Sequence, residues 1–448
     1  MENGALIEKY DVRVPRYTSY PSIPLWDSAS FRLEDWQAEI QKTFREENGL
    51  LSLYLHLPFC EKLCTYCGCN RRVTVNHGVE SPYIKALLRE WKMYRDLLNT
   101  RPVLNELHLG GGTPTFFSAE NLKQLISSLL ETADTPPNHE YSLEVHPNYT
   151  QKNQLEVLAA LGFNRLSMGV QDFDGKVQRA IHRIQTVEQT EQCNDNARVL
   201  GYSVNMDIVF GLPFQTLDAI KFTMEQVIRM RPDRIAFYSY AHVPWKSAAQ
   251  RGYNDADLPQ KDEKMSLYET GKTLLLDAGY EAIGMDHFAL PDDPLLLALK
   301  SGKLNRNFMG YTNNNNRLQL ALGVSAIADC WTMFAQNNKE VETYEKEVAA
   351  GKFPLLKGHH LTPAELKIRK HIINLICNYQ THWDASENEF MHQLLANLQE
   401  LINDKLVIVS DTAIVTTEMG KPFIRNICAA IDPMLQNVSG QNMFSLSV

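Results

Sequence analysis

Four cysteines lie close together in the stretch HLPFCEKLCTYCGCN, residues 56–70. They are Cys60, Cys64, Cys67 and Cys69, while the other four cysteines of the chain, at positions 193, 330, 377 and 428, stand alone. In a reducing compartment, clustered cysteines are typical of metal ligands or catalytic thiols rather than of disulfides. The stretch therefore predicts a metal centre, closed by four thiolates or left open by three.

Three kinds of metal site compete for this spacing. Structural zinc usually pairs two distant C-x2-C segments, and the chain has no second one. An electron-transfer cluster needs four thiolates, but Cys67 and Cys69 are so close that one cube would strain the loop. In the third alternative, Cys60, Cys64 and Cys67 bind three irons of a 4Fe-4S cluster, and the fourth iron stays open to an amino acid's amine and carboxylate. We favour the third alternative, because the spacing follows directly after a predicted strand.

The elements around this loop predict an α/β fold. Short apolar runs at 51–57, 105–110, 141–147, 165–171, 203–213, 234–244 and 280–290 are typical of strands, and helical patterns separate them. Such alternation predicts parallel strands joined by crossover helices, here a partial (β/α)6 TIM-like barrel. Polar residues and glycines gather where these runs end, which is where the active site of a β/α barrel lies. We therefore expect the cysteine loop, GGGTP (110–114), Glu144, Gln171 and Asp207 to share one mouth.

Composition limits the kind of protein. The chain has 448 residues, 44% of them hydrophobic, and a formal net charge of -9. No long uncharged apolar run predicts a membrane span, and the acidic balance argues against nucleic acid as a partner. We expect a cytoplasmic protein with an N-terminal arm (1–35), a catalytic barrel (36–340) and a C-terminal, mostly helical, winged-helix-like domain (341–448). No feature demands an oligomer, so a monomer is expected.

Several longer motifs resemble a known family. The cysteine stretch is similar to that of radical S-adenosylmethionine (SAM) enzymes. PRYTSYP, CGCN, GGGTPT, FNRLSMGVQDF, MDIVFGLP, YAHVP, GMDHF, RNFMGYT, GVSAI and RNIC resemble the oxygen-independent coproporphyrinogen III oxidases nearly end to end. This resemblance implies one 4Fe-4S cluster, two SAM molecules and oxidative decarboxylation of two propionates of coproporphyrinogen III to vinyl groups. Reduced flavodoxin or ferredoxin is the implied electron donor, and a haem-binding or trafficking relative with the same fold is the alternative.

The resemblance also implies roles for individual residues. Cys60, Cys64 and Cys67 would ligate the cluster, and Tyr54, Gly111 and Glu144 would place the first SAM. The second SAM would contact Tyr66, Gly112, Thr113, Gln171, Arg183, Asp207, Ala241 and Ile327. Candidate catalytic residues are Glu144, Cys69 and His56. From their positions, Cys69 is expected near the cavity, not as a ligand but in substrate contact or hydrogen transfer. His56 is either a proton or electron relay near the cluster or a barrel-lining histidine bonded to a neighbour. Four arginines in motif loops are candidates for binding propionates: Arg16, Arg71, Arg72 and Arg306.

One position departs from the family pattern. Met309 stands where the family commonly carries glutamine, and the run 313–322 differs as well. Methionine lacks the paired donor and acceptor of an amide. We therefore expect altered contacts to the second SAM or the substrate at this position.

Overall fold

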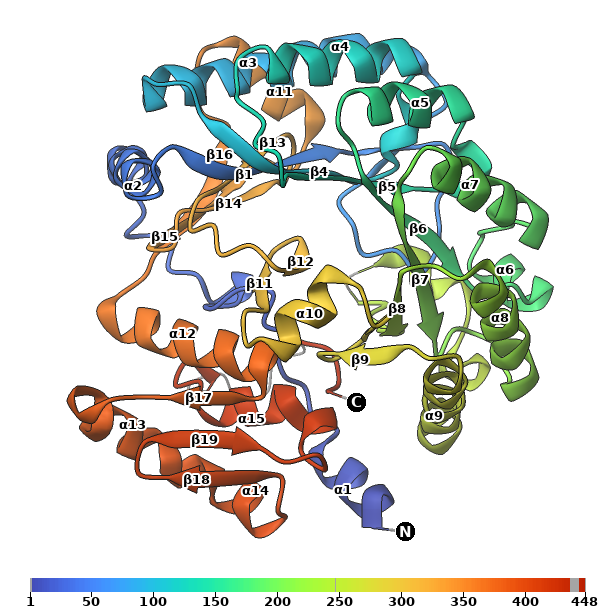
Figure 1. Cartoon of the computed structure of the whole chain (residues 1–448), viewed down its shortest axis with the longest axis vertical. Coiled ribbons are helices and arrows are strands. Elements are labelled where there is room, and N and C mark those ends of the chain that lie inside the picture. Colours follow the sequence, from blue (N-terminus) through green and yellow to red (C-terminus); the bar gives the residue numbers. More distant parts are fainter. Residues whose placement is uncertain (1, 246, 436–442, 448) are drawn as a thin grey trace.

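A mixed sheet of twelve strands dominates the computed structural model, which describes residues 2–245, 247–435 and 443–447. Its centre is six parallel strands: β1 (Leu50–Leu57), β4 (Val103–Gly111), β5 (Glu140–Val145), β6 (Arg165–Gln171), β7 (Ser203–Phe210) and β8 (Arg234–Ser239). The crossover helices cover the outer face (Figure 1): α3 (Glu80–Leu98), α4 (Ala119–Leu130), α5 (Lys152–Ala160), α7 (Val187–Val199) and α8 (Leu217–Met230). The two edge strands of this sheet do not pair with each other among the described residues, so the sheet is open. The predicted partial (β/α)6 barrel is therefore confirmed.

Alternation along β1 shows how the sequence sets the two faces of this sheet. Leu51, Leu53, Leu55 and Leu57 have no exposed surface and belong to the main hydrophobic core. Successive side chains of a strand point to opposite faces, so Tyr54 and His56 face the interior of the barrel. The cysteine loop follows directly after Leu57 and lies at the mouth.

The segment 280–290 corrects one prediction. It is not a single parallel strand but an antiparallel hairpin of β9 (Glu281–Ile283) and β10 (His287–Ala289), paired with β8. The turn contains Gly284, whose φ of +61° is a conformation that favours glycine. Apolar alternation alone did not reveal this turn.

The sequence also did not indicate how the sheet extends beyond β1. β13 (Gln319–Leu322) runs parallel to β1, and β14 (Ile327–Asp329), β15 (Met333–Asn337) and β16 (Leu355–His360) follow in antiparallel order. Helix α11 (Val341–Ala349) lies between β15 and β16 in the chain. Because β16 belongs to this sheet, the barrel's sheet reaches past residue 340, and the division at 35 and 340 stays a prediction.

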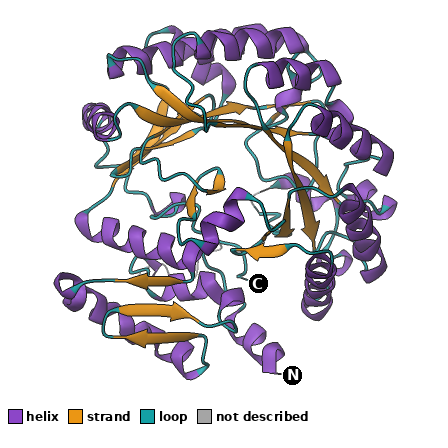
Figure 2. Cartoon of the chain, in the orientation of Figure 1, coloured by secondary structure: helices purple, strands orange, loops and turns teal. Residues whose placement is uncertain are grey.

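The C-terminal unit has the winged-helix-like order that the sequence predicted. It contains α12 (Pro363–Asn378), β17 (Gln380–His382), α13 (Asn388–Leu395), α14 (Gln399–Asn403), β18 (Val407–Ser410), β19 (Ala413–Thr416) and α15 (Ile424–Ala430). Figure 2 shows its small sheet below the barrel, flanked by helices. The remaining elements of the chain are α1 (Glu2–Tyr10), α2 (Leu33–Glu46), β2 (Phe59–Cys60), β3 (Arg72–Val73), α6 (Gly175–Ala180), α9 (Lys261–Asp277), α10 (Pro294–Lys300), β11 (Asn305–Asn307) and β12 (Gly310–Thr312).

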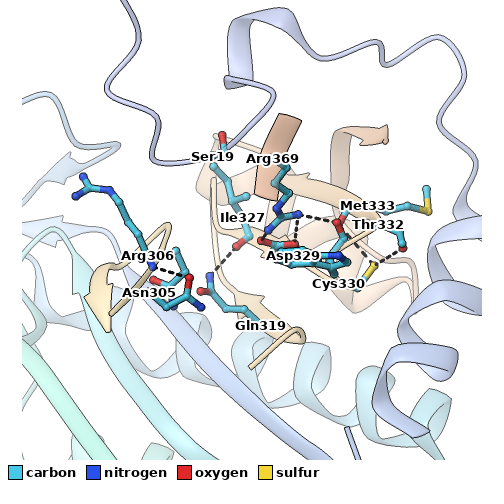
Figure 3. A network of polar contacts seen from close by, with 12 residues as sticks. Ser19, Asn305, Arg306, Gln319, Ile327, Asp329, Cys330, Thr332, Met333 and Arg369 are labelled. Carbon is cyan, nitrogen blue, oxygen red and sulfur yellow. Dashed lines mark hydrogen bonds and ion pairs between the residues drawn. The ribbon is translucent and has the colours of Figure 1, made fainter. Parts of the chain in front are cut away.

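An ion pair joins the C-terminal unit to the barrel. Arg369 of α12 donates from both terminal nitrogens to Asp329 of β14, and its Nη1 also donates to the Trp331 carbonyl at 2.6 Å. Figure 3 shows this paired contact beside β14. Arg369 is 6% exposed and Asp329 is 7% exposed, so water solvates neither charge well and each depends on the other.

Among the described residues, no helix is long and apolar enough to cross a membrane.

Replacing Arg369 with methionine should therefore lower stability strongly. The variant leaves the Asp329 carboxylate buried without its charge partner, and we expect the free energy of unfolding to fall by about 3 kcal/mol. Urea unfolding of the apoprotein measures this change. The control is Arg317→Met, which removes an exposed pair with Glu46 and should change the free energy by about 0.5 kcal/mol or less. Equal losses in both variants would contradict the role of the buried pair.

Candidate functional site

The carboxyl ends of the parallel strands surround a cavity of about 900 Å³. Parallel strands end at the same edge of a sheet, so the loops that follow them converge there. The sequence-predicted site residues in its wall are Cys60, Cys64, Tyr66, Cys67, Cys69, Gly111, Gly112, Thr113, Glu144, Gln171, Arg183 and Asp207. We call this space the cofactor cavity.

Donors and cations hold the cysteine loop in place. Arg71 Nη1 donates to the carbonyls of Cys67 and Cys69 at 3.1 and 3.0 Å. The Thr113 hydroxyl lies 3.4 Å from the Cys60 sulfur, and Arg183 Nη1 lies 3.7 Å from the Cys64 sulfur. A nearby guanidinium stabilises a thiolate, the form that binds metal. Arg71, one of the arginines considered for the substrate, thus supports the loop backbone.

The thiols differ in acidity. A hydrogen bond from Cys69 lowers the pKa of Cys67 to about 6, whereas burial raises the pKa of Cys60 to about 11. Cys67 and Cys69 thus affect each other's acidity, and the pKa of Cys69 is raised in turn. Which of the cysteines bind iron stays a prediction.

The chemistry of the donor set fits a 4Fe-4S cluster. Thiolates are the usual protein ligands of such clusters, and each binds a different iron. Cys60, Cys64 and Cys67 lie in the wall of one cavity, with Arg183 Nη1 near the Cys64 sulfur. Within residues 2–245, 247–435 and 443–447, no group of three or more Cys, His, Asp or Glu side chains is placed to hold a single metal ion.

The GGGTP segment brings backbone close to the cysteine loop. Gly111 has φ of +110°, and a Cβ there would lie 2.7 Å from the His56 ring. A Cβ on Gly112 would lie 2.6 Å from the Pro58 carbonyl. Only glycine permits both approaches, which let the Gly112 N–H donate to the Leu57 carbonyl at 2.8 Å and so hold the two segments together.

Glu144 lies where three cavities meet, and its side chain is 43% exposed. It accepts hydrogen bonds from the Gly111 N–H at 3.2 Å and from His108 Nε2 at 3.5 Å. Burial alone would raise the pKa of Glu144, but the hydrogen bonds from His108 and Gly111 outweigh it and lower that pKa. The carboxylate is therefore charged and accessible to an ammonium or a hydroxyl group.

Sequence reasoning missed His108. Its Nδ1 accepts from the Ser142 hydroxyl at 2.8 Å, which leaves Nε2 to donate to Glu144. The ring of Tyr54 stacks on it with 5.8 Å between centroids. The same alternation that turned Tyr54 and His56 inward along β1 would have indicated His108 along β4.

The side chains of Tyr54 and His56 lie beside the cofactor cavity rather than in its wall. His56 Nε2 donates to the Asn70 carbonyl at 2.7 Å, so its Nδ1 accepts from the Tyr54 hydroxyl at 3.0 Å. Burial lowers the pKa of His56, which keeps the ring neutral. This chain of contacts fixes the end of the cysteine loop to β1.

Asp207 is fixed by its neighbours on the barrel interior. Asn205 Nδ2 donates to it at 2.8 Å, and the Ser167 hydroxyl lies at 3.3 Å. Burial, and then the charge of Glu144, raise the pKa of Asp207 to about 6. Gln171 follows at the same mouth with φ of +70°, an uncommon backbone conformation for a residue other than glycine.

Ile327 and Ala241 lie apart from the residues just described. Ile327 lines a neighbouring cavity of about 560 Å³ together with Tyr54, His56, Cys69 and Glu144. Figure 3 shows how Gln319 Nε2 donates to the Ile327 carbonyl, at 3.4 Å, on the strand that Asp329 ties to α12. Ala241 lines another cavity, which lies beyond β8 and is not one of the three that meet at Glu144.

The other three candidate arginines lie in different parts of the structure. Arg72 is exposed and pairs with Glu342 on the surface. Arg306 lies over the Tyr311 ring at 4.5 Å, and Arg16 lies 3.6 Å from Asp286. Of these three, Arg16 faces a sizeable cavity, the one that Ala241 also lines.

Comparisons with known proteins agree with this site. The family model of the Radical SAM superfamily matches residues 54–227. The oxygen-independent coproporphyrinogen III oxidase of Escherichia coli (strain K12) is 40% identical over 451 residues, covering 98% of this chain and 97% of that protein. The enzyme of the same name from Pseudomonas aeruginosa is 36% identical over 447 residues, covering 97% and 96%. The solved structure of the Escherichia coli coproporphyrinogen III oxidase (HemN), a radical SAM enzyme, matches with a TM-score of 0.90 and 38% identity, over 96% of this chain and 98% of that one.

The fold, the thiol loop and these matches define a radical SAM protein. Within that superfamily, the chain belongs to the oxygen-independent coproporphyrinogen III oxidase family. Met309, the departure noted in the sequence, lies in the loop between β11 and β12 and lines the same cavity as Ile327. Its effect on ligand contacts stays a prediction.

Serine substitutions should separate the cluster ligands from Cys69. We expect Cys69→Ser, reconstituted without oxygen, to keep the iron content of the unmodified protein, because Cys69 is predicted to lie near the cavity without binding iron. Cys60→Ser should lose most of the iron. Iron per chain and visible absorbance measure both. If Cys69→Ser lost iron to the same extent, Cys69 would be a ligand.

Asp207 should make stability depend on pH in a defined direction. Its pKa of about 6 in the folded protein exceeds the ordinary value of about 3.9, so the folded state binds more protons between these values. The free energy of unfolding should therefore fall as pH rises through this window. Asp207→Asn has no such titration, so the variant should gain stability relative to the unmodified apoprotein between about pH 4 and pH 7. A difference that is constant with pH in urea unfolding would contradict the shift.

Proposed function

We propose that this protein is an oxygen-independent coproporphyrinogen III oxidase that converts two propionates of its substrate to vinyl groups, giving protoporphyrinogen IX in anaerobic haem biosynthesis. The observation that carries the proposal is the three-thiol loop at the mouth of a barrel that matches the Escherichia coli enzyme nearly end to end. The cofactors are a 4Fe-4S cluster, held by Cys60, Cys64 and Cys67, and SAM.

When bound and reduced, the cluster with SAM would supply a 5′-deoxyadenosyl radical able to take a hydrogen atom from the β-carbon of a propionate; CO2 would then leave, and the electron released with it would pass to an electron acceptor. The chain's own residues position the reactants. Glu144 would accept hydrogen bonds from the amine or hydroxyl groups of the first SAM, and Gly111 would help to place it. Tyr54 packs against the same region through its contacts with His56 and His108.

A second SAM molecule belongs to the proposal as well. Tyr66, Gly112, Thr113, Gln171, Arg183 and Asp207 would contact it from the wall of the cofactor cavity, with Ala241 and Ile327 at the edges. The first six of these residues line one cavity together with the cysteine loop, which supports this proposal. The Asp207 carboxylate, within reach of Asn205 and Ser167, would accept from an amine.

Cys69 and His56 are proposed to act at the cluster's edge. Cys69 lines both the cofactor cavity and the cavity of Ile327, so it lies at the boundary between the two. We assign it substrate contact or hydrogen transfer. His56, neutral and tied to Asn70, would keep the loop closed around the cluster.

The cellular setting follows from this chemistry. An electron donor of low potential is required, and reduced flavodoxin or ferredoxin suits that task. We further propose that the protein acts as a cytoplasmic monomer.

An anaerobic assay tests the proposed reaction. The reconstituted protein with coproporphyrinogen III, SAM and a reductant should release CO2, methionine and 5′-deoxyadenosine, with two of each for every protoporphyrinogen IX formed. Omission of SAM and the Cys60→Ser variant serve as controls, and both should give no product. Absence of 5′-deoxyadenosine and vinyl product in the complete mixture would contradict the proposal, and stoichiometric haem binding would then favour a haem-trafficking role.

A further inference from the structure

A cavity of about 480 Å³ lies beyond β8, outside the cofactor cavity. Its walls come from the N-terminal arm, the ends of β7 and β8, helix α9 and the segment around α15. Figure 1 shows the N-terminal helix beside the C-terminal unit, which brings the two ends of the chain to this region. We call this space the arm cavity.

The motifs PRYTSYP and RNIC, which do not line the cofactor cavity, contribute to the wall of the arm cavity. Arg425 of RNIC donates to the carbonyls of Val14 and Pro15, next to and within PRYTSYP, and to the Leu446 carbonyl at 2.7 Å. Arg425 is 6% exposed. The contacts fix the arm against α15 and leave Arg16, one residue further on, facing the cavity.

The glycine of MDIVFGLP shapes the opposite wall. Gly211 has φ of +82°, and a Cβ there would lie 2.9 Å from the Cε of Lys264. Glycine at this position lets the aliphatic stem of Lys264 lie against the end of β7. The ammonium group then reaches the arm cavity, where its Nζ lies 3.4 Å from the Tyr240 carbonyl.

Charge in the arm cavity is predominantly positive. Seven basic residues line it against four acidic ones. Between them stand apolar and aromatic side chains, including Phe210, Tyr240, Met265, Tyr268 and Phe423. Apolar walls with several cations suit a large, mostly apolar ligand that carries more than one carboxylate.

Lys264 differs from the other lining lysines. Lys261 pairs with Asp11 at 3.7 Å, Lys272 with Glu269 at 3.8 Å and Lys421 with Glu418 at 2.6 Å. In the part of the chain that the structure describes, Lys264 forms no ion pair with a carboxylate, although it is half-buried. Burial lowers the pKa of Lys264 to about 8, so the group is still mostly charged at neutral pH. A partly buried cation such as the Lys264 ammonium group is stabilised when an anion binds beside it.

The arm cavity adjoins the cofactor cavity along β8. Tyr238 lines the cofactor cavity, and Ser239, Tyr240 and Ala241 line the arm cavity. The Arg16 guanidinium lies 6.0 Å from the Tyr238 ring centroid, at the boundary between the two. A ligand in the arm cavity would thus lie next to the wall of the cofactor cavity at Tyr238.

We propose that the arm cavity binds the tetracarboxylate substrate, with Lys264 and Arg16 receiving propionates other than the one that is being decarboxylated. The inference rests on the proposed function for the identity of the substrate. The chemical class, an apolar ring that carries several carboxylates, follows from the cavity itself. Lys264 and Arg16 are positioning residues, because they hold groups remote from the reacting carbon.

A lysine-to-methionine substitution tests this site. Lys264→Met keeps the length of the side chain and removes its charge. We expect the KM for coproporphyrinogen III to rise about tenfold or more with a smaller change in kcat, as for loss of one charge-assisted contact. Coproporphyrin III, a stable fluorescent tetracarboxylate, serves as a binding probe without turnover, and its dissociation constant should rise by a similar factor. Lys264→Arg should restore most of the affinity for the probe.

Two controls show that the change is local. Lys221→Met removes an exposed charge on α8 and should leave KM and probe affinity unchanged. Iron content and SAM affinity should be the same in every variant, which also reports correct folding.

Two results would overturn the inference: probe affinity within twofold of the unmodified value in Lys264→Met, or an unchanged KM in an active protein. If the unmodified protein bound the probe through Lys264 but formed no vinyl product, the proposed function would fail and the carboxylate site would stand.

Discussion

The parallel register of β1 and β4 to β8 is the constraint on which the site depends. It brings the ends of six strands to one edge, so that a loop of three thiols, a glycine turn and two carboxylates meet although they come from distant parts of the sequence. The contact between the Gly111 N–H and Glu144 joins two neighbouring strands at this edge. The thiol loop, the glycine turn and the carboxylate side chains are short or rigid, so the parallel strands determine how they lie relative to one another.

Much of this arrangement could be predicted from the sequence, because it depends on local patterns. Leucines at alternate positions of β1 determined which side chains face inward, and the strand order placed Cys60, Glu144 and Asp207 at one mouth. The helices and hairpin of the C-terminal unit were also visible in their periodicity. These signals are properties of single elements and need no knowledge of long-range contacts.

Other features depend on contacts between distant segments, which no local pattern indicates. The hairpin at 281–289 depends on a turn at Gly284, and the sheet extends beyond β1 because β1 pairs with β13, more than 250 residues away in the chain. The contacts of Arg425 with the arm span more than 400 residues. His108 was overlooked because a lone histidine in a strand resembles an ordinary core residue, until its contacts with Glu144 and Ser142 are seen.

The central claim is that Cys60, Cys64 and Cys67 leave one iron of the cluster open for SAM. Electron paramagnetic resonance of the reduced protein, recorded before and after addition of SAM labelled with nitrogen-15 in its amino group, tests this claim most directly. The account predicts that the cluster signal shifts on addition of SAM and shows hyperfine coupling to the labelled nitrogen. A signal that stays the same and shows no coupling, in protein with a full iron content, would contradict it.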